Sequence, residues 1–166
     1  MDSAGVEKIA DKYLNSLYRV AVNYCKNAEN AGDAVQNAFL KLMKSDMSFN
    51  DEEHVYKWLI KVTINECKNF WRVFRLHPTV SFDELEDENS PDNLEDGSAV
   101  NMVLAHELRD AVIRLPAKYS VVIHLFYYDG YSIDEIAEIL NLSSSAVKMR
   151  LMRGKQKLKN EIDEGD

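Results

Sequence analysis

YSIDEIAEILNLSSSAVKMRLMRGKQKLK, residues 131–159, contains two short helical patterns separated by a turn. Ser132 lies three residues before Glu135, which is the spacing of a capping box at the start of a helix. Asn141-Leu142 then predicts a tight turn, and Ser143 can cap the helix that follows. Apolar residues recur at intervals of three and four on both sides of the turn, as in amphipathic helices. The stretch therefore predicts a helix-turn-helix.

The second helix of this stretch is strongly basic. Residues 143–160 carry six Lys and Arg side chains and no Asp or Glu: Lys148, Arg150, Arg153, Lys155, Lys157 and Lys159. Phosphates attract such a cluster through counterion release, and a recognition helix can reach base edges in the major groove. A solvated basic helix end is the alternative, because cations are favoured near a helix C-terminus. The cap, the turn and the small residues at 144–146 nevertheless favour a DNA-binding unit over about residues 108–159.

The composition of the chain favours helices, because only 6 Gly and 3 Pro occur among 166 residues, of which 46% are apolar. This length fits one or two compact domains. The net charge of −8 argues against nucleic acid only until its distribution is considered. Residues 81–100 hold eight acidic and no basic side chains. Such a segment cannot bury enough surface to offset its ordering entropy, so we predict an extended or disordered acidic linker.

The first half of the chain predicts three helices. Apolar residues recur at intervals of three and four over 14–25 and again over 34–43, which is typical of amphipathic helices. A third periodic run over 55–74 predicts one long helix. It is expected to end at His77-Pro78, because proline disfavours helix in the preceding residue and lacks an amide donor. The chain as a whole is predicted to be all-α.

The third run of the first half also carries basic and aromatic side chains: Lys57, Lys61, Lys68, Arg72, Arg75, Trp58, Phe70 and Trp71. Basic residues beside aromatics suit single-stranded nucleic acid, because bases stack on the rings. Aromatics at helical spacing are more often part of a core, and we expect some of these rings to be buried. Both interpretations stay open on the sequence alone.

The sequence carries no catalytic pattern. It contains no glycine-rich phosphate loop, no HExxH pair and no Cys/His spacing suited to zinc. We therefore expect no enzymatic activity, no cofactor and no metal. Cys25 and Cys67 have apolar, helix-like surroundings and are interpreted as reduced core thiols. No stretch reaches the ~18 to 20 apolar residues of a membrane helix, and the N-terminus lacks a secretory pattern, so the expected location is cytoplasmic.

Two segments of the first half, YLNSLYRVAVNYCKNAENAGDAVQNAFLKLMKS (13–45) and VYKWLIKVTINECKNFWR (55–72), resemble region 2 of group 4 bacterial sigma factors, the extracytoplasmic-function (ECF) group. The C-terminal stretch resembles their region 4. The matching positions are Asp33, Gln36, Phe39, Trp58-Leu59, Asn65, Leu115-Pro116, Glu135-Ile136-Ala137 and Val147-Lys148. The C-terminal half alone would also resemble the output domain of a response regulator. The ordered combination, which covers nearly the whole chain, is specific.

The resemblance implies two small helical domains and their partners. It divides the chain into sigma region 2, a flexible acidic linker and helix-turn-helix sigma region 4: residues 1–77, 78–102 and 103–166. The first domain is expected to dock on the β′ clamp helices of core RNA polymerase through Asp33, Gln36, Phe39 and Leu40. The second domain is expected to sit on the β flap. A cognate anti-sigma factor is a further expected partner, and the free protein is expected to be a monomer.

The resemblance also assigns promoter contacts to the two domains. The −10 element is expected to meet Lys61, Asn65, Lys68 and Arg72, where unstacked bases are captured as the DNA melts. The −35 element is expected to meet Ser144, Ser145, Lys148, Arg150 and Arg153. The chain departs from the family pattern at Asn69, where Asp is frequent, and at Ala146, where Thr is frequent. The sequence assigns no role to Met149 and Met152.

Two other functions remain as alternatives. A stand-alone helix-turn-helix regulator would bind a palindromic site tightly as a dimer, whereas a polymerase-dependent factor with a net charge of −8 should bind promoter DNA weakly alone. A helical adaptor would use its basic tail to contact acidic protein instead of DNA. Neutralising Lys148, Arg150 and Arg153 would then leave any DNA-dependent activity intact.

Overall fold

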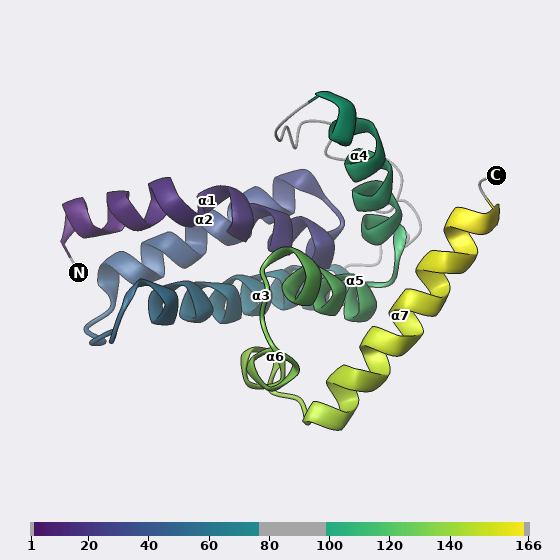
Figure 1. Cartoon of the computed structure of the whole chain (residues 1–166). Coiled ribbons are helices and arrows are strands. Elements are labelled where there is room, and N and C mark those ends of the chain that lie inside the picture. Colours follow the sequence, from purple (N-terminus) through teal and green to yellow (C-terminus); the bar gives the residue numbers. More distant parts are fainter. Residues whose placement is uncertain (1, 77–98, 165–166) are drawn as a thin grey trace. The chain divides into compact units, whose positions relative to one another are not determined.

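The computed structural model describes residues 2–76 and 99–164, and every regular element in these ranges is helical. The chain divides into two compact units, which are described separately (Figure 1). Unit 1 contains α1 (Ser3–Cys25), α2 (Ala28–Lys44) and α3 (Glu52–Leu76). Unit 2 contains α4 (Ala99–Arg114), α5 (Ala117–Ile123), the π-helical turn η1 (His124–Tyr128), α6 (Ile133–Leu140) and α7 (Ser144–Glu164). The prediction of two all-α domains is confirmed. The predicted acidic linker lies largely outside the described residues.

Short polar side chains start the helices of unit 1. The carboxylate of Asp2 accepts a hydrogen bond from the Gly5 amide at 2.8 Å, and Asn27 caps α2 in the same way. Each of these bonds satisfies an amide that has no partner within its own helix. At the other end of the unit, α3 is described to Leu76. The predicted single long helix is confirmed, and its predicted end at His77-Pro78 lies outside the described residues.

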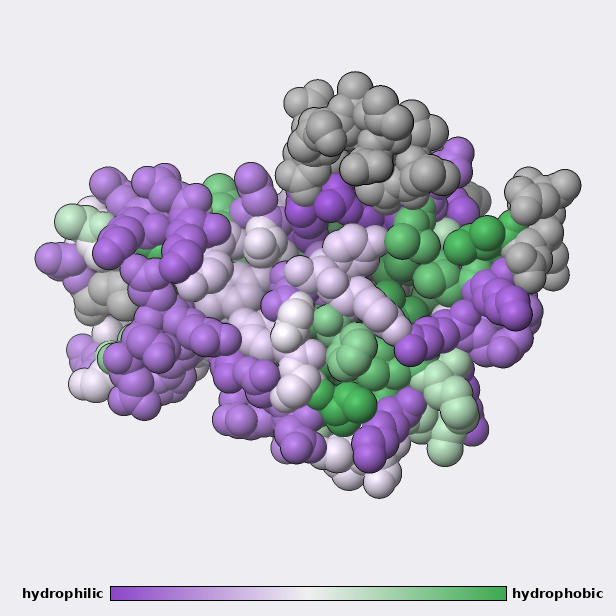
Figure 2. Space-filling view, in the orientation of Figure 1, coloured by the Kyte–Doolittle hydropathy of each residue, from purple (hydrophilic) through white to green (hydrophobic). Residues whose placement is uncertain are grey.

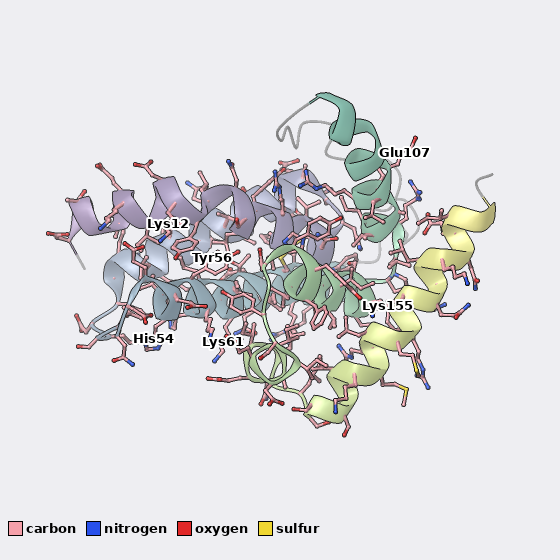
Figure 3. The ribbon with its side chains drawn as sticks, viewed as in Figure 1. Lys12, His54, Tyr56, Lys61, Glu107 and Lys155 are labelled. Atoms are coloured by element: carbon pink, nitrogen blue, oxygen red, sulfur yellow. A yellow bond between two sulfur atoms is a disulfide. The ribbon has the colours of Figure 1, made fainter. Side chains whose placement is uncertain are left out.

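Each helix of unit 1 packs against the other two, and their apolar faces form one core. Its largest fully buried side chains are Leu17, Val20, Val22, Leu42, Leu59 and Ile60. The ring of Tyr13 on α1 lies tilted against that of Tyr56 on α3, with ring centroids 4.5 Å apart. Next to this contact, Lys12 donates to Glu52 at 2.7 Å, a hydrogen bond that holds the pKa of Glu52 below its usual value. Figure 3 labels Lys12 on α1 and Tyr56 on α3.

The two cysteines of unit 1 differ from their predicted state. Cys25, at the end of α1, and Cys67, in α3, form a disulfide whose Cα atoms lie 5.5 Å apart. Both residues are buried, as predicted, but they are not two separate thiols. The pairing depends on how α1 packs on α3, because the cysteines are 42 residues apart in the sequence. The interpretation as reduced thiols is corrected accordingly.

The helix-turn-helix of unit 2 has the local geometry that the sequence predicts. Ser132 and Glu135 form the reciprocal capping box at the start of α6. Asn141 ends α6 in the left-handed conformation with φ 56°, and the hydroxyl of Ser143 accepts from the Ala146 amide at the start of α7. Figure 2 shows hydrophobic residues gathered over α5 and α6. The buried side chains there include Leu125, Ile136, Val147 and Leu151.

The apolar run before the helix-turn-helix contains a feature that the sequence did not reveal. Between α5 and α6 the backbone widens into the π-helical turn η1, where the Asp129 amide donates to the His124 carbonyl at 3.1 Å. The buried His124 ring stacks on the Tyr128 ring, with centroids 5.2 Å apart. Gly130 follows with φ 75°, which favours glycine. The helix does stop at Asp129-Gly130, as predicted. The π-helical turn before that stop, which contains one residue more than an α-helical turn, was not predicted.

Gly154 allows α7 to approach α5. A Cβ atom at this position would lie 2.8 Å from Cδ1 of Ile123 and 3.2 Å from Cβ of Tyr119. We expect Gly154→Val to lower the free energy of unfolding of unit 2 by about 1 to 3 kcal/mol, because an overpacked contact forces side chains or backbone to shift. Urea denaturation followed by circular dichroism would measure the change.

The matched control for this substitution is Gly32→Ala in α2. A Cβ atom at Gly32 would meet nothing within 4 Å, so alanine should leave packing unchanged and stabilise unit 1 by roughly 0.5 to 1 kcal/mol. An equal or greater stability of Gly154→Val relative to the parent protein would contradict the close approach of α5 and α7.

Candidate polymerase and nucleic-acid interfaces

The first candidate surface runs along α3. The predicted −10 residues are spaced by four, three and four positions, which places them on one face of the helix. Asn65, Lys68 and Arg72 are exposed, and Lys61 is half-buried. The guanidinium of Arg72 donates to the Asn69 side chain at 2.8 Å, so the departure from the family pattern at Asn69 still provides an acceptor for Arg72. This surface, Lys61, Asn65, Lys68 and Arg72, is called the α3 face below.

Buried contacts behind the α3 face fix its orientation. Glu66 is only 9% exposed, and its carboxylate accepts from Lys41 at 2.5 Å and from Asn37 at 3.3 Å. Both partners lie on α2, so a charge-assisted pair ties the two helices together. Cys67, the next residue of α3, is joined to α1 through the disulfide. Adjacent residues thus connect the α3 face to both other helices of the unit.

The aromatic side chains of α3 are neither fully buried nor fully exposed. Trp58, Phe70 and Trp71 are all half-buried. With about 100° of rotation per residue, Trp58 and Trp71 flank the α3 face, whereas Phe70 lies on the opposite side of the helix. Phe49, from the segment before α3, lies edge-on against Trp58 with ring centroids 5.8 Å apart and also contacts His54 at 5.3 Å. Sequence reasoning missed Phe49, because it lies in a polar segment without periodicity.

The second candidate surface is the exposed side of α2. Of the residues predicted to bind polymerase, Asp33, Gln36 and Leu40 are exposed, and Phe39 is half-buried. Helical spacing extends the exposed side to Met43, which is 53% exposed. Met47, which is 50% exposed, follows just beyond the helix. We call Leu40, Met43 and Met47 the α2 patch below. These three large apolar side chains are exposed to water, and a group of this kind is more typical of an interaction surface than single scattered apolar residues are. Sequence reasoning missed both methionines.

The third candidate surface is the side of α7 that turns away from the core of unit 2. Ser145, Lys148 and Arg153 are exposed, whereas Ser144 and Arg150 are half-buried. The hydroxyl of Ser144 donates to the carboxylate of Asp134 at 2.6 Å, which ties the start of α7 to α6. The structure therefore brings three of the five predicted −35 residues to the exposed side and gives Ser144 a partner within the protein.

Two other cations of α7 contact rings within unit 2. The Lys155 ammonium lies 5.2 Å from the centroid of the Tyr127 ring, and Lys157 lies 5.8 Å from that of Tyr119. These distances suit cation–π attraction, which helps to hold α7 against the segment α5–η1. Figure 3 labels Lys155 on α7 and Lys61 on α3. Some cations of α7 thus contact rings of unit 2, whereas others are exposed without such a contact.

The described residues were also compared with the arrangements typical of metal sites and membrane spans. Within residues 2–76 and 99–164, no three His, Cys, Asp or Glu side chains are grouped so as to hold a metal ion. None of the described helices is long and apolar enough to cross a membrane. The described surfaces offer cations for phosphates, amides and hydroxyls for base edges, and rings for stacking.

Comparison with known proteins finds a family match for each of the two helical units. The family model for sigma-70 region 2 matches residues 9–73, and that for sigma-70 region 4 matches residues 105–158. Two matched helical regions of this kind define a sigma-70-type factor for transcription initiation, which is not an enzyme.

The relatives identify the group. The ECF RNA polymerase sigma-E factor of Escherichia coli (strain K12) is 32% identical, over 97% of this chain and 88% of the relative. The ECF RNA polymerase sigma factor SigW of Bacillus subtilis (strain 168) is 27% identical, over 97% of this chain and 90% of the relative. The chain belongs to the ECF RNA polymerase sigma factors, which direct transcription initiation.

A solved structure shares the fold. The sigma factor RpoE from Bartonella quintana, in complex with the anti-sigma factor NepR, matches with a TM-score of 0.71 and 18% sequence identity. The match covers 95% of this chain and 96% of that chain. At this identity the likeness supports the fold alone.

Proposed function

We propose that this sigma factor contacts core polymerase and promoter DNA through the three surfaces described above. The α2 patch, with Asp33, Gln36 and Phe39, binds the β′ clamp helices. The α3 face binds the −10 element, and the exposed side of α7 binds the −35 element. The observation that carries the proposal is the convergence of the predicted −10 residues on one face of α3, flanked by the half-buried rings of Trp58 and Trp71. Cations with nearby aromatics suit an opened DNA strand.

The proposal assigns different roles to the members of the α3 face. Lys61, Lys68 and Arg72 neutralise phosphates, whereas the Asn65 amide can both donate to and accept from a base edge. Binding energy from these contacts favours the melted state without any chemical step. Because the whole chain carries a net charge of −8, the free protein binds promoter DNA weakly, and polymerase supplies the remaining contacts.

Further partners follow from the relatives by analogy. The Bartonella quintana structure contains a sigma factor bound to an anti-sigma factor, and we propose that this chain is also held by such a protein. Unit 2 is proposed to sit on the β flap. The predicted division at residues 1–77, 78–102 and 103–166 and the monomeric free state are retained as proposals. We also propose a cytoplasmic location for this chain, because core polymerase acts there.

Transcription by purified core polymerase, with and without this protein, tests the proposal. We expect new start sites on genomic fragments only when the protein is present. Lys68→Ala and Lys148→Ala should each lower the yield about fivefold to tenfold, because each removes a contact worth about 1 to 1.4 kcal/mol. Run-off transcripts at low protein concentration would measure the loss.

Lys8→Ala is the matched control for both substitutions. Its side chain is exposed on α1 and contacts Glu52, outside the three proposed surfaces. The same charge is removed, so the yield should stay within twofold of the parent. Absence of any protein-dependent transcript would contradict the proposed function. Tight binding of the free protein to a palindromic site would favour a stand-alone regulator instead.

A further inference from the structure

Two methionines occupy the middle of the exposed side of α7. Met149 is 43% exposed and Met152 is 62% exposed, although both side chains are large and apolar. With about 100° of rotation per residue, Ser145, Met149 and Met152 lie within about 60° of one another around the helix axis. The buried residues Val147 and Leu151 lie on the opposite side. Ser145, Met149 and Met152 are called the methionine ridge below.

Exposed cations flank the methionine ridge on both sides. Lys148 and Lys159 lie on one side of it around the helix. Arg153 lies on the other side, together with Lys157, whose ammonium also approaches the Tyr119 ring. Residues 143–160 contain no acidic side chain that would offset these charges. The ridge is therefore an uncharged strip between two rows of positive charge. A ligand with two anionic edges and an apolar centre would complement this surface.

The major groove of DNA has this character, because it admits an α-helix between two phosphate backbones. Its floor presents one apolar group, the C5-methyl of thymine. Methionine cannot donate a hydrogen bond to guanine or adenine, and its flexible thioether packs well against small apolar groups. A protein partner with an apolar helix would match the methionines but not the two flanking rows of cations.

We infer that Met149 and Met152 read thymine methyl groups in the upstream promoter element and so make this factor prefer thymine at the positions they contact. The inference rests on the proposed function, since it requires α7 to enter the major groove. Ser145 is then the hydrogen-bonding member of the ridge, because the Ser144 hydroxyl is held by Asp134 at 2.6 Å. Lys148 and Arg153 hold the helix between the two backbones.

Replacing thymine by uracil tests this inference, because uracil lacks only the C5-methyl group. Holoenzyme assembled with the full chain is titrated onto a promoter in which each thymine of the duplex upstream element is changed to uracil in turn. We expect two positions at which binding falls about threefold to fivefold, the scale of burying one methyl group. Met149→Ala and Met152→Ala should each abolish the effect at one of these positions and leave the other unchanged.

Lys159→Ala is the matched control on the same helix. It removes an exposed cation beside the ridge, so it should weaken binding to all templates equally and preserve the response to uracil. A thymine-to-uracil change that never alters binding would overturn the inference, as would an upstream element without thymine. Protein-dependent transcription in either case would leave the proposed function standing. A response to uracil that survives both methionine substitutions would also overturn the inference.

Discussion

Assembly with core polymerase is expected to weaken at least about 100-fold when Leu40 and Met43 are both replaced by aspartate. These side chains are 44% and 53% exposed, so the fold does not depend on them. In the proposed interface they become buried, and two carboxylates without partners would then lose their hydration. A loss of 100-fold corresponds to about 2.7 kcal/mol, which is the scale of an interface hot spot. Titration of labelled protein against core polymerase would measure it.

The matched control is the double variant Leu14→Asp and Asn15→Asp. Both side chains are exposed on α1, Leu14 at 46%, and both lie outside the proposed contacts of α2 and of unit 2. This variant has the same added charge as the first, so it separates a local effect from general repulsion. Its affinity should stay within about threefold of the parent, which is roughly 0.6 kcal/mol. Equal behaviour of the two double variants would remove the α2 patch from the proposed interface.

Reduction of the disulfide between Cys25 and Cys67 is expected to destabilise unit 1 by about 4 kcal/mol. The estimate comes from the entropy that a cross-link closing a loop of 42 residues removes from the unfolded chain. The only two tryptophans, Trp58 and Trp71, lie in unit 1, so their fluorescence reports on that unit alone. Urea denaturation with and without reductant would show a lower midpoint for the reduced protein.

The double variant Cys25→Ala and Cys67→Ala provides the control for this experiment. Its midpoint should not respond to reductant, and it should lie near that of the reduced parent. After reduction the Cys67 thiol retains an acceptor, because its sulfur lies 3.9 Å from the Ala21 carbonyl oxygen. Two free thiols in the unreduced protein, together with no change of midpoint, would refute the covalent link. In a reducing compartment the reduced protein, which has the lower free energy of unfolding, would prevail.

Local features of this chain could be predicted from sequence because neighbouring residues determine them. The capping box of Ser132 and Glu135 needs only two side chains three residues apart, and the structure contains it. The length of α3 follows from the apolar periodicity of residues 55–74 in the same way. The shared face of the −10 residues follows from helical spacing alone, although their role in DNA binding stays a prediction.

Features that depend on tertiary packing could not be predicted. The disulfide requires α1 to lie on α3, and the spacing of two isolated cysteines does not reveal that contact. The hydrogen bond from Ser144 to Asp134 depends on the angle between α6 and α7, and no motif encodes it. Exposure of the two apolar side chains Met43 and Met152 is likewise a property of the packed helices. Sequence patterns assign hydrophobic side chains to a core by default.

The π-helical turn at His124–Tyr128 has a geometric consequence for everything that follows it in unit 2. One additional residue within an α-helical path turns the chain by about 100° relative to a helix without it. This rotation changes the direction in which the chain continues from η1 towards α6. The direction in which α7 presents its exposed side therefore depends on the extra residue in η1, a partly buried segment. The orientation of α7 thus depends on residues other than those proposed to contact DNA.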